Sequence, residues 1–176
     1  MGPRSWFAVV VATFALAIAC APKPQPTAAE HGVATRDTWV ALEKFGTRIQ
    51  VPPGWEFAQG DGLVASFARD ASGGWSLAGA ADKSDAKAQL ALGLREMGIE
   101  LGAPRGTTHD VDLHGIVFAR QDFDASVSGK PAQVTVLAAD EPPRGKGMVI
   151  FIGYAVTGDE ARRDNLRSSI ASIGPR

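Results

Sequence analysis

Histidine and carboxylate side chains gather at one place in this sequence, the run HDVDLH from His109 to His114. Alternate residues of an extended strand point the same way, so Asp110, Asp112 and His114 would share one face. Imidazole and carboxylate are common ligands of divalent metals, which makes this face a possible metal site. Same-face neighbours lie about 6.5–7 Å apart, so one ion reaches all three only if the strand bends. The other interpretation is a solvated outer face, and we expect no resident metal or other cofactor.

Nucleophilic and acid–base catalysis have weaker support in the sequence. Ser76 lies in GWSLAG, where the second glycine comes one place too late for a nucleophile elbow. A Ser–His–Asp set would have to use His109 or His114, and no spacing points to one. Asp122 and Asp124 stand two apart, a spacing too common to indicate catalytic carboxylates. We therefore expect a protein that is not an enzyme, with a hydrolase as the remaining catalytic alternative.

The only cysteine, Cys20, has a different chemistry. Residues 1–19 contain one cation, Arg4, and an apolar run that is too short to span a bilayer, a pattern typical of a secretory signal. The end of this segment, LAIAC, resembles the lipobox of bacterial lipoproteins, although Ala17 stands where leucine is usual and Leu16 is displaced by one. The resemblance implies that Cys20 is acylated and becomes the mature N-terminus. The alternative is an ordinary signal followed by a chance cysteine.

Residues 20–36 are rich in proline and alanine and lack an apolar period, which predicts a tether between the lipid and a domain. Several acyl chains on Cys20 would hold the protein at a membrane. Ala21 is not the aspartate that marks inner-membrane retention in many bacteria, which by that resemblance implies the outer membrane facing the periplasm. The alternative is the outer leaflet of the inner membrane.

Residues 37–176 are predicted to form a single domain. The chain after the signal has a net charge of −2 and no cluster of basic residues, so we expect no nucleic-acid partner. Apolar residues alternate with polar ones along most of the domain, and this period indicates β-strands. The predicted strands are 45–51, 63–69, 74–80, a group that opens with 110–127, then 131–140 and 148–156.

The last of these strands, 148–156, is apolar on both faces and should be central, with cover above and below. Two amphipathic segments, 82–98 and 157–173, supply that cover as helices. Thr157 and Glu160 have the spacing of a capping box at the start of the second helix. The sequence therefore predicts an α+β domain, a mainly antiparallel sheet flanked by two helices.

The run VPPGW, Val51 to Trp55, ends one strand and predicts a type II turn with Pro53 and Gly54 at its centre. A strand running into VPPGW, a hairpin, one helix, a strand meander and a closing LRSSIASI helix together resemble the PsbP-like family, which includes the DcrB-type bacterial lipoproteins. The resemblance covers about residues 39–173 and implies an α/β/α sandwich that binds partners without catalysis. It carries no catalytic residues onto this chain.

Partner binding would use exposed aromatic or basic side chains. Trp39, Trp55, Arg144 and Lys146 are the candidates, the last two in the glycine-rich run PPRGKG. Trp55 and Trp75 have core packing as their alternative. The sequence thus predicts a lipid-anchored module that binds or assembles with an envelope protein. The alternative is a small-ligand or metal-binding lipoprotein that uses the face of Asp110, Asp112 and His114.

Overall fold

The computed structural model describes residues 30–60 and 62–176. The predicted signal segment, Cys20 and most of the predicted tether lie outside the described residues. Within the described part, no helix is both long enough and apolar enough to cross a lipid bilayer.

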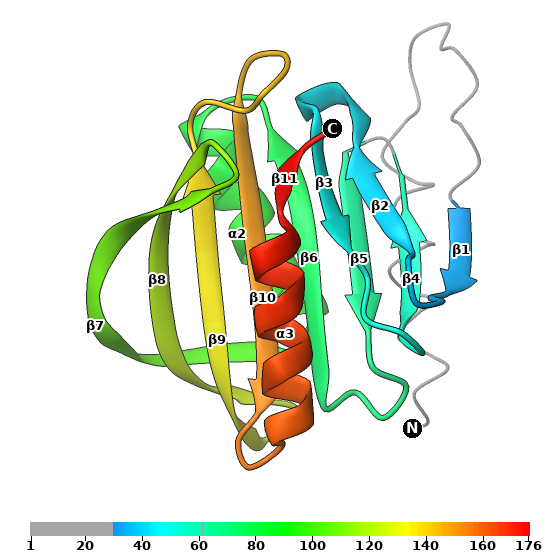
Figure 1. Ribbon diagram of the computed structural model, residues 1–176. Coiled ribbons are helices and arrows are strands. Elements are labelled where there is room, and N and C mark those ends of the chain that lie inside the picture. Colours follow the sequence, from blue (N-terminus) through cyan, green and yellow to red (C-terminus); the bar gives the residue numbers. More distant parts are fainter. Residues whose placement is uncertain (1–29, 61) are drawn as a thin grey trace, which may run out of the picture.

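A curved, eight-stranded sheet forms the centre of the domain (Figure 1). Every neighbouring pair in this sheet is antiparallel, as predicted. From one edge to the other, the strands are β1 (Glu30–Val33), β4 (Glu56–Gln59), β5 (Leu63–Phe67), β6 (Gly73–Ala80), β10 (Met148–Val156), β9 (Lys130–Ala139), β8 (Ile116–Val127) and β7 (Ile99–Leu113).

One helix covers each face of this sheet, which confirms the α+β prediction. Helix α2 (Lys83–Glu96) packs on one face, and helix α3 (Glu160–Ser172) packs on the other. The α3 face also carries a small antiparallel sheet of three strands (Figure 1). Its strands are β2 (Trp39–Leu42), β3 (Thr47–Gln50) and β11 (Gly174–Pro175), and the short 3-10 helix η1 (Glu43–Phe45) links the first two.

Strand β10 is central, as its two-sided apolar pattern predicts. Ile150, Ile152 and Tyr154 are buried toward α2, whereas Val149 and Phe151 are buried toward α3. Burial on both faces makes β10 the strand that joins the two halves of the core.

The turn PPGW has the predicted conformation. The amide of Trp55 donates to the carbonyl of Pro52 at 3.1 Å, and Gly54 has a φ of 79°, which glycine accepts without strain. Because β3 belongs to the small sheet and β4 to the large one, this turn carries the chain from one sheet to the other. Trp55 is 1% exposed, so its side chain belongs to the core.

Three details differ from the predictions. Strand β1 lies within the predicted tether, because main-chain pairing with β4 orders a segment whose side chains are mostly exposed. The N-cap of α3 is Asp159, whose carboxylate accepts from the Arg162 amide at 3.0 Å, and not Thr157. His114, expected on a strand face with Asp110 and Asp112, lies in a turn, since β7 ends at Leu113 and β8 begins at Ile116.

Strand β7 is the exposed edge of the sheet and curves away from its neighbour (Figure 1). Its pairing with β8 shifts register at two places, between Leu101 and Pro104 and between Arg105 and His109. Such bulges bend a strand and increase its twist. The curvature of these outer strands leaves space between them and α3.

Candidate functional site: a cleft between helix α3 and the outer strands

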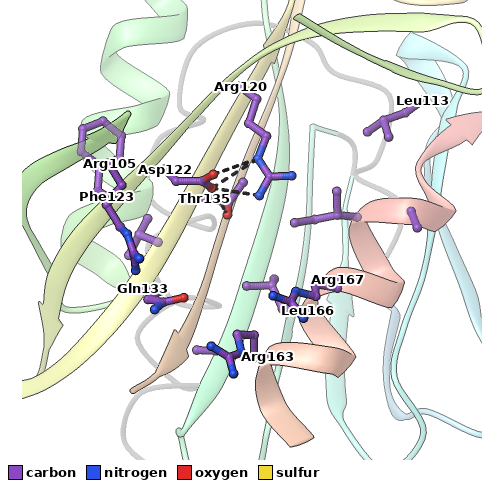
Figure 2. Close-up of a pocket in the computed structure, with 14 residues that line it drawn as sticks. Arg105, Leu113, Arg120, Asp122, Phe123, Gln133, Thr135, Arg163, Leu166 and Arg167 are labelled. Atoms are coloured by element: carbon purple, nitrogen blue, oxygen red, sulfur yellow. Dashed lines mark hydrogen bonds and ion pairs between the residues drawn. The ribbon is translucent and has the colours of Figure 1, made fainter. Parts of the chain in front are cut away.

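A cleft of about 560 Å³ lies between α3 and strands β7 to β10 (Figure 2). This volume falls within the range of small-molecule binding sites. We call it the α3 cleft. Its polar lining residues are Arg105, Arg120, Asp122, Gln133, Thr135, Arg163 and Arg167, and apolar lining includes Leu113, Leu166, Ile170 and Ala171.

The floor of the cleft is an ion pair on β8 that also accepts a hydrogen bond from β9. Arg120 and Asp122 are two residues apart on β8, so their side chains emerge on the same face. The Arg120 Nε donates to Asp122 Oδ2 at 3.1 Å, and its Nη2 donates to Oδ1 at 3.1 Å. Thr135 lies opposite Asp122 on β9 and donates its hydroxyl to Oδ1 at 2.5 Å (Figure 2). Both charged side chains are about one-third exposed, which leaves Arg120 facing the cleft.

Helix α3 supplies the opposite wall through one stripe of its surface. Arg163, Leu166, Arg167 and Ile170 stand at helical spacing, and all four line the cleft. Leu166 and Ile170 are buried and fasten the helix to the sheet. The same stripe therefore places two guanidinium groups one helical turn apart at the cleft wall (Figure 2).

These two arginines have only weak partners within the described chain. Arg163 pairs with Glu160 and Arg167 pairs with Asp164, each three residues earlier on the helix. Both carboxylates are 67–70% exposed, and ion pairs of this kind contribute only about 0.2–1 kcal/mol. The Nε of Arg163 is buried and has no hydrogen-bond partner among the described residues. The hydrogen-bonding capacity of this donor is therefore unused within the described chain.

The lining of the cleft carries more positive than negative charge. Four arginines line it, and Asp122 is the only carboxylate among the described lining residues. Arg105 on β7 also pairs, at 3.5 Å, with Asp124, whose side chain is 66% exposed. The cleft therefore offers cationic hydrogen-bond donors to an entering group and few acceptors.

The cleft also changes in polarity along its length. Arg163 lies in the first turn of α3, and Ile170 and Ala171 lie in the last. Leu113, at the end of β7, lines the same apolar end, where the neighbouring His114 Nε2 lies 2.9 Å from the Ala171 carbonyl oxygen. From Arg163 to Ala171 the helix rises about 12 Å. One end of the cleft is thus cationic and the other is apolar.

The predicted face of Asp110, Asp112 and His114 does not form. His114 lies in the β7–β8 turn with a φ of 55°, and not on the strand. Asp112 Oδ1 accepts from the Gly115 amide at 2.7 Å, so this carboxylate stabilises the turn. Among residues 30–60 and 62–176, no three His, Cys, Asp or Glu side chains gather in a way that could hold a metal ion.

The predicted partner-binding residues lie outside the cleft lining. Trp55 is in the core, but Trp39 on β2 is 43% exposed and the Arg48 guanidinium stacks 4.7 Å from its ring centroid. Arg144 and Lys146 are exposed on the loop between β9 and β10. Trp39, Arg144 and Lys146 are therefore exposed, although they are not brought together with the α3 cleft, and Trp55 is not exposed.

A second polar cluster joins the β5–β6 hairpin to α3. The Arg162 Nε donates to Ser72 Oγ at 2.9 Å, and its Nη2 donates to Asp70 Oδ2 at 3.3 Å. Burial tends to raise the pKa of Asp70, but hydrogen bonds from Ser72 and Arg162 outweigh it and lower that pKa below its usual value. Burial, together with the Asp70 charge, raises the pKa of Tyr154 to about 12. All of these groups have partners in the protein, so the cluster is structural.

The cleft arginines are not among the site residues that the sequence predicts. Arg163 and Arg167 have a detectable signal, because they share helical spacing with the predicted core residues Leu166 and Ile170. Charged residues on a helix are normally exposed to solvent, so this spacing alone does not indicate a binding site. Arg105 and Arg120 have no comparable signal, since only the bulged β7–β8 pairing brings them to the cleft.

Comparison with known proteins gives no family. No protein-family model matches the chain, and no curated protein matches it. A solved structure from Bacteroides thetaiotaomicron VPI-5482 is similar with a TM-score of 0.49 and 10% identity, over 81% of this chain and 49% of that one. This chain therefore spans about half the length of that protein.

A second similar structure is LpqN, involved in cell envelope biogenesis of Mycobacterium tuberculosis. Its TM-score is 0.40 at 11% identity, over 84% of this chain and 91% of that one. At this level of likeness, neither structure assigns a family or an activity to this chain.

Proposed function

We propose that this protein is a non-catalytic binding protein of the bacterial cell envelope that holds its ligand in the α3 cleft. The observation that supports this proposal is the cleft itself, which has a volume of about 560 Å³ and is lined by four arginines and an apolar wall. Its described lining includes no histidine, cysteine or serine, and the one hydroxyl group there, on Thr135, donates to Asp122, which is itself paired with Arg120. Binding is therefore the function that we assign, in place of hydrolysis.

The same proposal includes a lipid anchor at Cys20 and a PsbP-like, DcrB-type domain. The LAIAC run supports acylation, and the antiparallel sheet with one helix on each face is compatible with the domain type. We place the anchor in the outer membrane, with the domain facing the periplasm. Mass spectrometry of the mature N-terminus tests the anchor, and Cys20→Ser should release the protein from membranes.

A thermal-shift screen against metabolites, lipids and short peptides tests the binding role. Ala171 is exposed and lines the cleft, so Ala171→Trp should fill the cleft without a change in the core. Ala161 is exposed on the same helix but is outside the lining, which makes Ala161→Trp a matched control. A ligand at about 100 times its Kd stabilises the fold by about 2.7 kcal/mol, a shift of several degrees in Tm.

At least one compound should shift the Tm of the wild type and of Ala161→Trp but not that of Ala171→Trp. If every compound shifts all three proteins alike, the cleft is not the binding site and this proposal is wrong.

A second candidate function is docking of an envelope protein partner outside the cleft. The observation that favours it is the exposed Trp39 stacked with Arg48, because Trp and Arg are frequent interface anchors. Trp39→Ala should then abolish co-purification of a partner from detergent-solubilised membranes, whereas Ala171→Trp should leave it unchanged.

A further inference from the structure

We infer that the α3 cleft takes an anionic amphiphile, a molecule with a carboxylate or phosphate head group and an apolar tail. This inference rests on the proposed binding role of the cleft and adds the chemistry of the ligand. The head group would lie between Arg163 and Arg167, and the tail would run along Ile170 toward Leu113.

The head-group position follows from the geometry of the helix. Residues four apart on a helix have Cβ atoms about 5–6 Å apart, so the guanidinium groups of Arg163 and Arg167 can both reach one oxyanion. Guanidinium groups match carboxylate and phosphate oxygens in pairs of parallel hydrogen bonds. Rotation of the Arg163 side chain would bring its buried Nε, which has no partner in the described chain, to the head group. Gln133 on β9 can add an amide donor from the sheet side.

The carboxylates that now pair with Arg163 and Arg167 do not prevent an oxyanion from binding there. Glu160 and Asp164 are mostly exposed, so they return to water at little cost when an oxyanion replaces them. Arg120, in contrast, stays bound to Asp122, which also accepts from the Thr135 hydroxyl, and this keeps the floor of the cleft in place. A ligand therefore meets two available arginines on the helix and a fixed ion pair on the sheet.

The tail position follows from the change in polarity along the cleft. Beyond Arg167 the wall contains Ile170 and Ala171, and Leu113 faces them from β7. The midpoint between Arg163 and Arg167 lies about 9 Å along the helix from Ala171, a length that suits a medium-length alkyl chain. A purely polar anion would leave the apolar end empty, and a neutral alkane would leave the arginines without a new partner.

Isothermal titration calorimetry with four probes tests this inference. The protein is the chain from residue 20 onward with Cys20→Ser, which remains unacylated and needs no detergent. Octanoate and octyl phosphate represent fatty-acid and phosphate head groups, octan-1-ol has the tail without charge, and inorganic phosphate has charge without the tail. At least one of the two charged amphiphiles should bind about tenfold more tightly than octan-1-ol and inorganic phosphate. Their relative affinities distinguish a carboxylate from a phosphate ligand.

Charge-matched variants identify the residues. Arg163→Gln with Arg167→Gln should weaken binding of the preferred amphiphile by at least about tenfold. Arg69→Gln with Arg95→Gln removes the same charge from exposed positions outside the cleft and should leave Kd within about twofold.

Three results would each overturn the inference: no binding of either charged amphiphile, equal binding of octan-1-ol, or equal weakening by both double variants. The screen with Ala171→Trp separates these results from failure of the proposed function. A screened compound that loses binding only in Ala171→Trp would keep the cleft as a binding site with a ligand of different chemistry.

Discussion

Asp122→Asn should change stability and anion binding in opposite directions. The substitution keeps the shape of the side chain and the oxygen that accepts from Thr135, but it removes the charge that pairs with Arg120. Exposed ion pairs contribute about 0.2–1 kcal/mol, and loss of one partner of a buried pair costs about 3–5 kcal/mol. Asp122 is 31% exposed and keeps most of its hydrogen bonds as asparagine, so we expect a loss of about 1–2 kcal/mol. For a domain of this size, Tm should fall by about 3–6 °C.

The same change should strengthen binding of an anion in the α3 cleft. Asp122 is the only carboxylate among the described lining residues, and its charge repels an anionic ligand. At roughly 10 Å and an effective dielectric constant between 20 and 80, this repulsion is about 0.4–1.7 kcal/mol. Asp122→Asn should therefore lower the Kd of the preferred amphiphile about twofold to twentyfold.

Urea unfolding and calorimetric titration of wild type, Asp122→Asn, Arg120→Gln and the double variant measure both effects. The stability cycle should give a coupling energy of about 1 kcal/mol between the two side chains. A variant as stable as the wild type, with a coupling near zero, would refute the structural role of the ion pair. Weaker anion binding by Asp122→Asn would refute the electrostatic description of the cleft.

Three further predictions concern stability at low pH, ionisation of the tyrosine at high pH, and packing at a glycine. Because hydrogen bonds lower the pKa of Asp70 in the folded protein, the unfolded chain binds more protons below about pH 4, and the free energy of unfolding should decrease as the pH drops through this range. In urea unfolding at several pH values, Asp70→Asn should make this decrease smaller. The same pH dependence in the variant and the wild type would contradict the prediction. Tyr154 is the only tyrosine, so the absorbance of its phenolate should rise near pH 12 in the folded protein. Its raised pKa stabilises the folded state below about pH 10, and this stabilisation should be lost as the pH rises from about 10 to 12. Ionisation near pH 10 in the folded protein would contradict the prediction. A Cβ at Gly79 would lie 1.9 Å from the Phe45 ring, whereas a Cβ at Gly62 would meet nothing within 4 Å. In urea unfolding, Gly79→Ala should therefore lower the free energy of unfolding by about 1–3 kcal/mol, and Gly62→Ala should lower it far less.

Much of the fold could be predicted from the sequence, because burial leaves a periodic pattern. The two-sided apolar run of β10 predicted a central strand, and the stripes of α2 and α3 predicted one helix for each face. The PPGW run predicted its turn because proline and glycine each restrict the backbone in a known way.

Strand β7 could not be predicted to its full length for the opposite reason. Residues 100–110 are all exposed, so no alternation of apolar and polar residues marks them as a strand. The alternation within HDVDLH favours an extended strand through His114, but the chain turns at His114 and Gly115. The α3 cleft depends on this strand and on its two register shifts, which explains why its existence could not be derived from local sequence patterns.

The most direct test of the α3 cleft as the binding site is a titration of the ¹⁵N-labelled protein with octyl phosphate, followed by NMR. We predict that amide shifts will concentrate on β8, β9 and α3, together with a shift of the Arg163 Nε–Hε signal. Shifts centred on Trp39 or on the loop that carries Arg144 and Lys146, with no change along α3, would contradict the assignment of the cleft as the site.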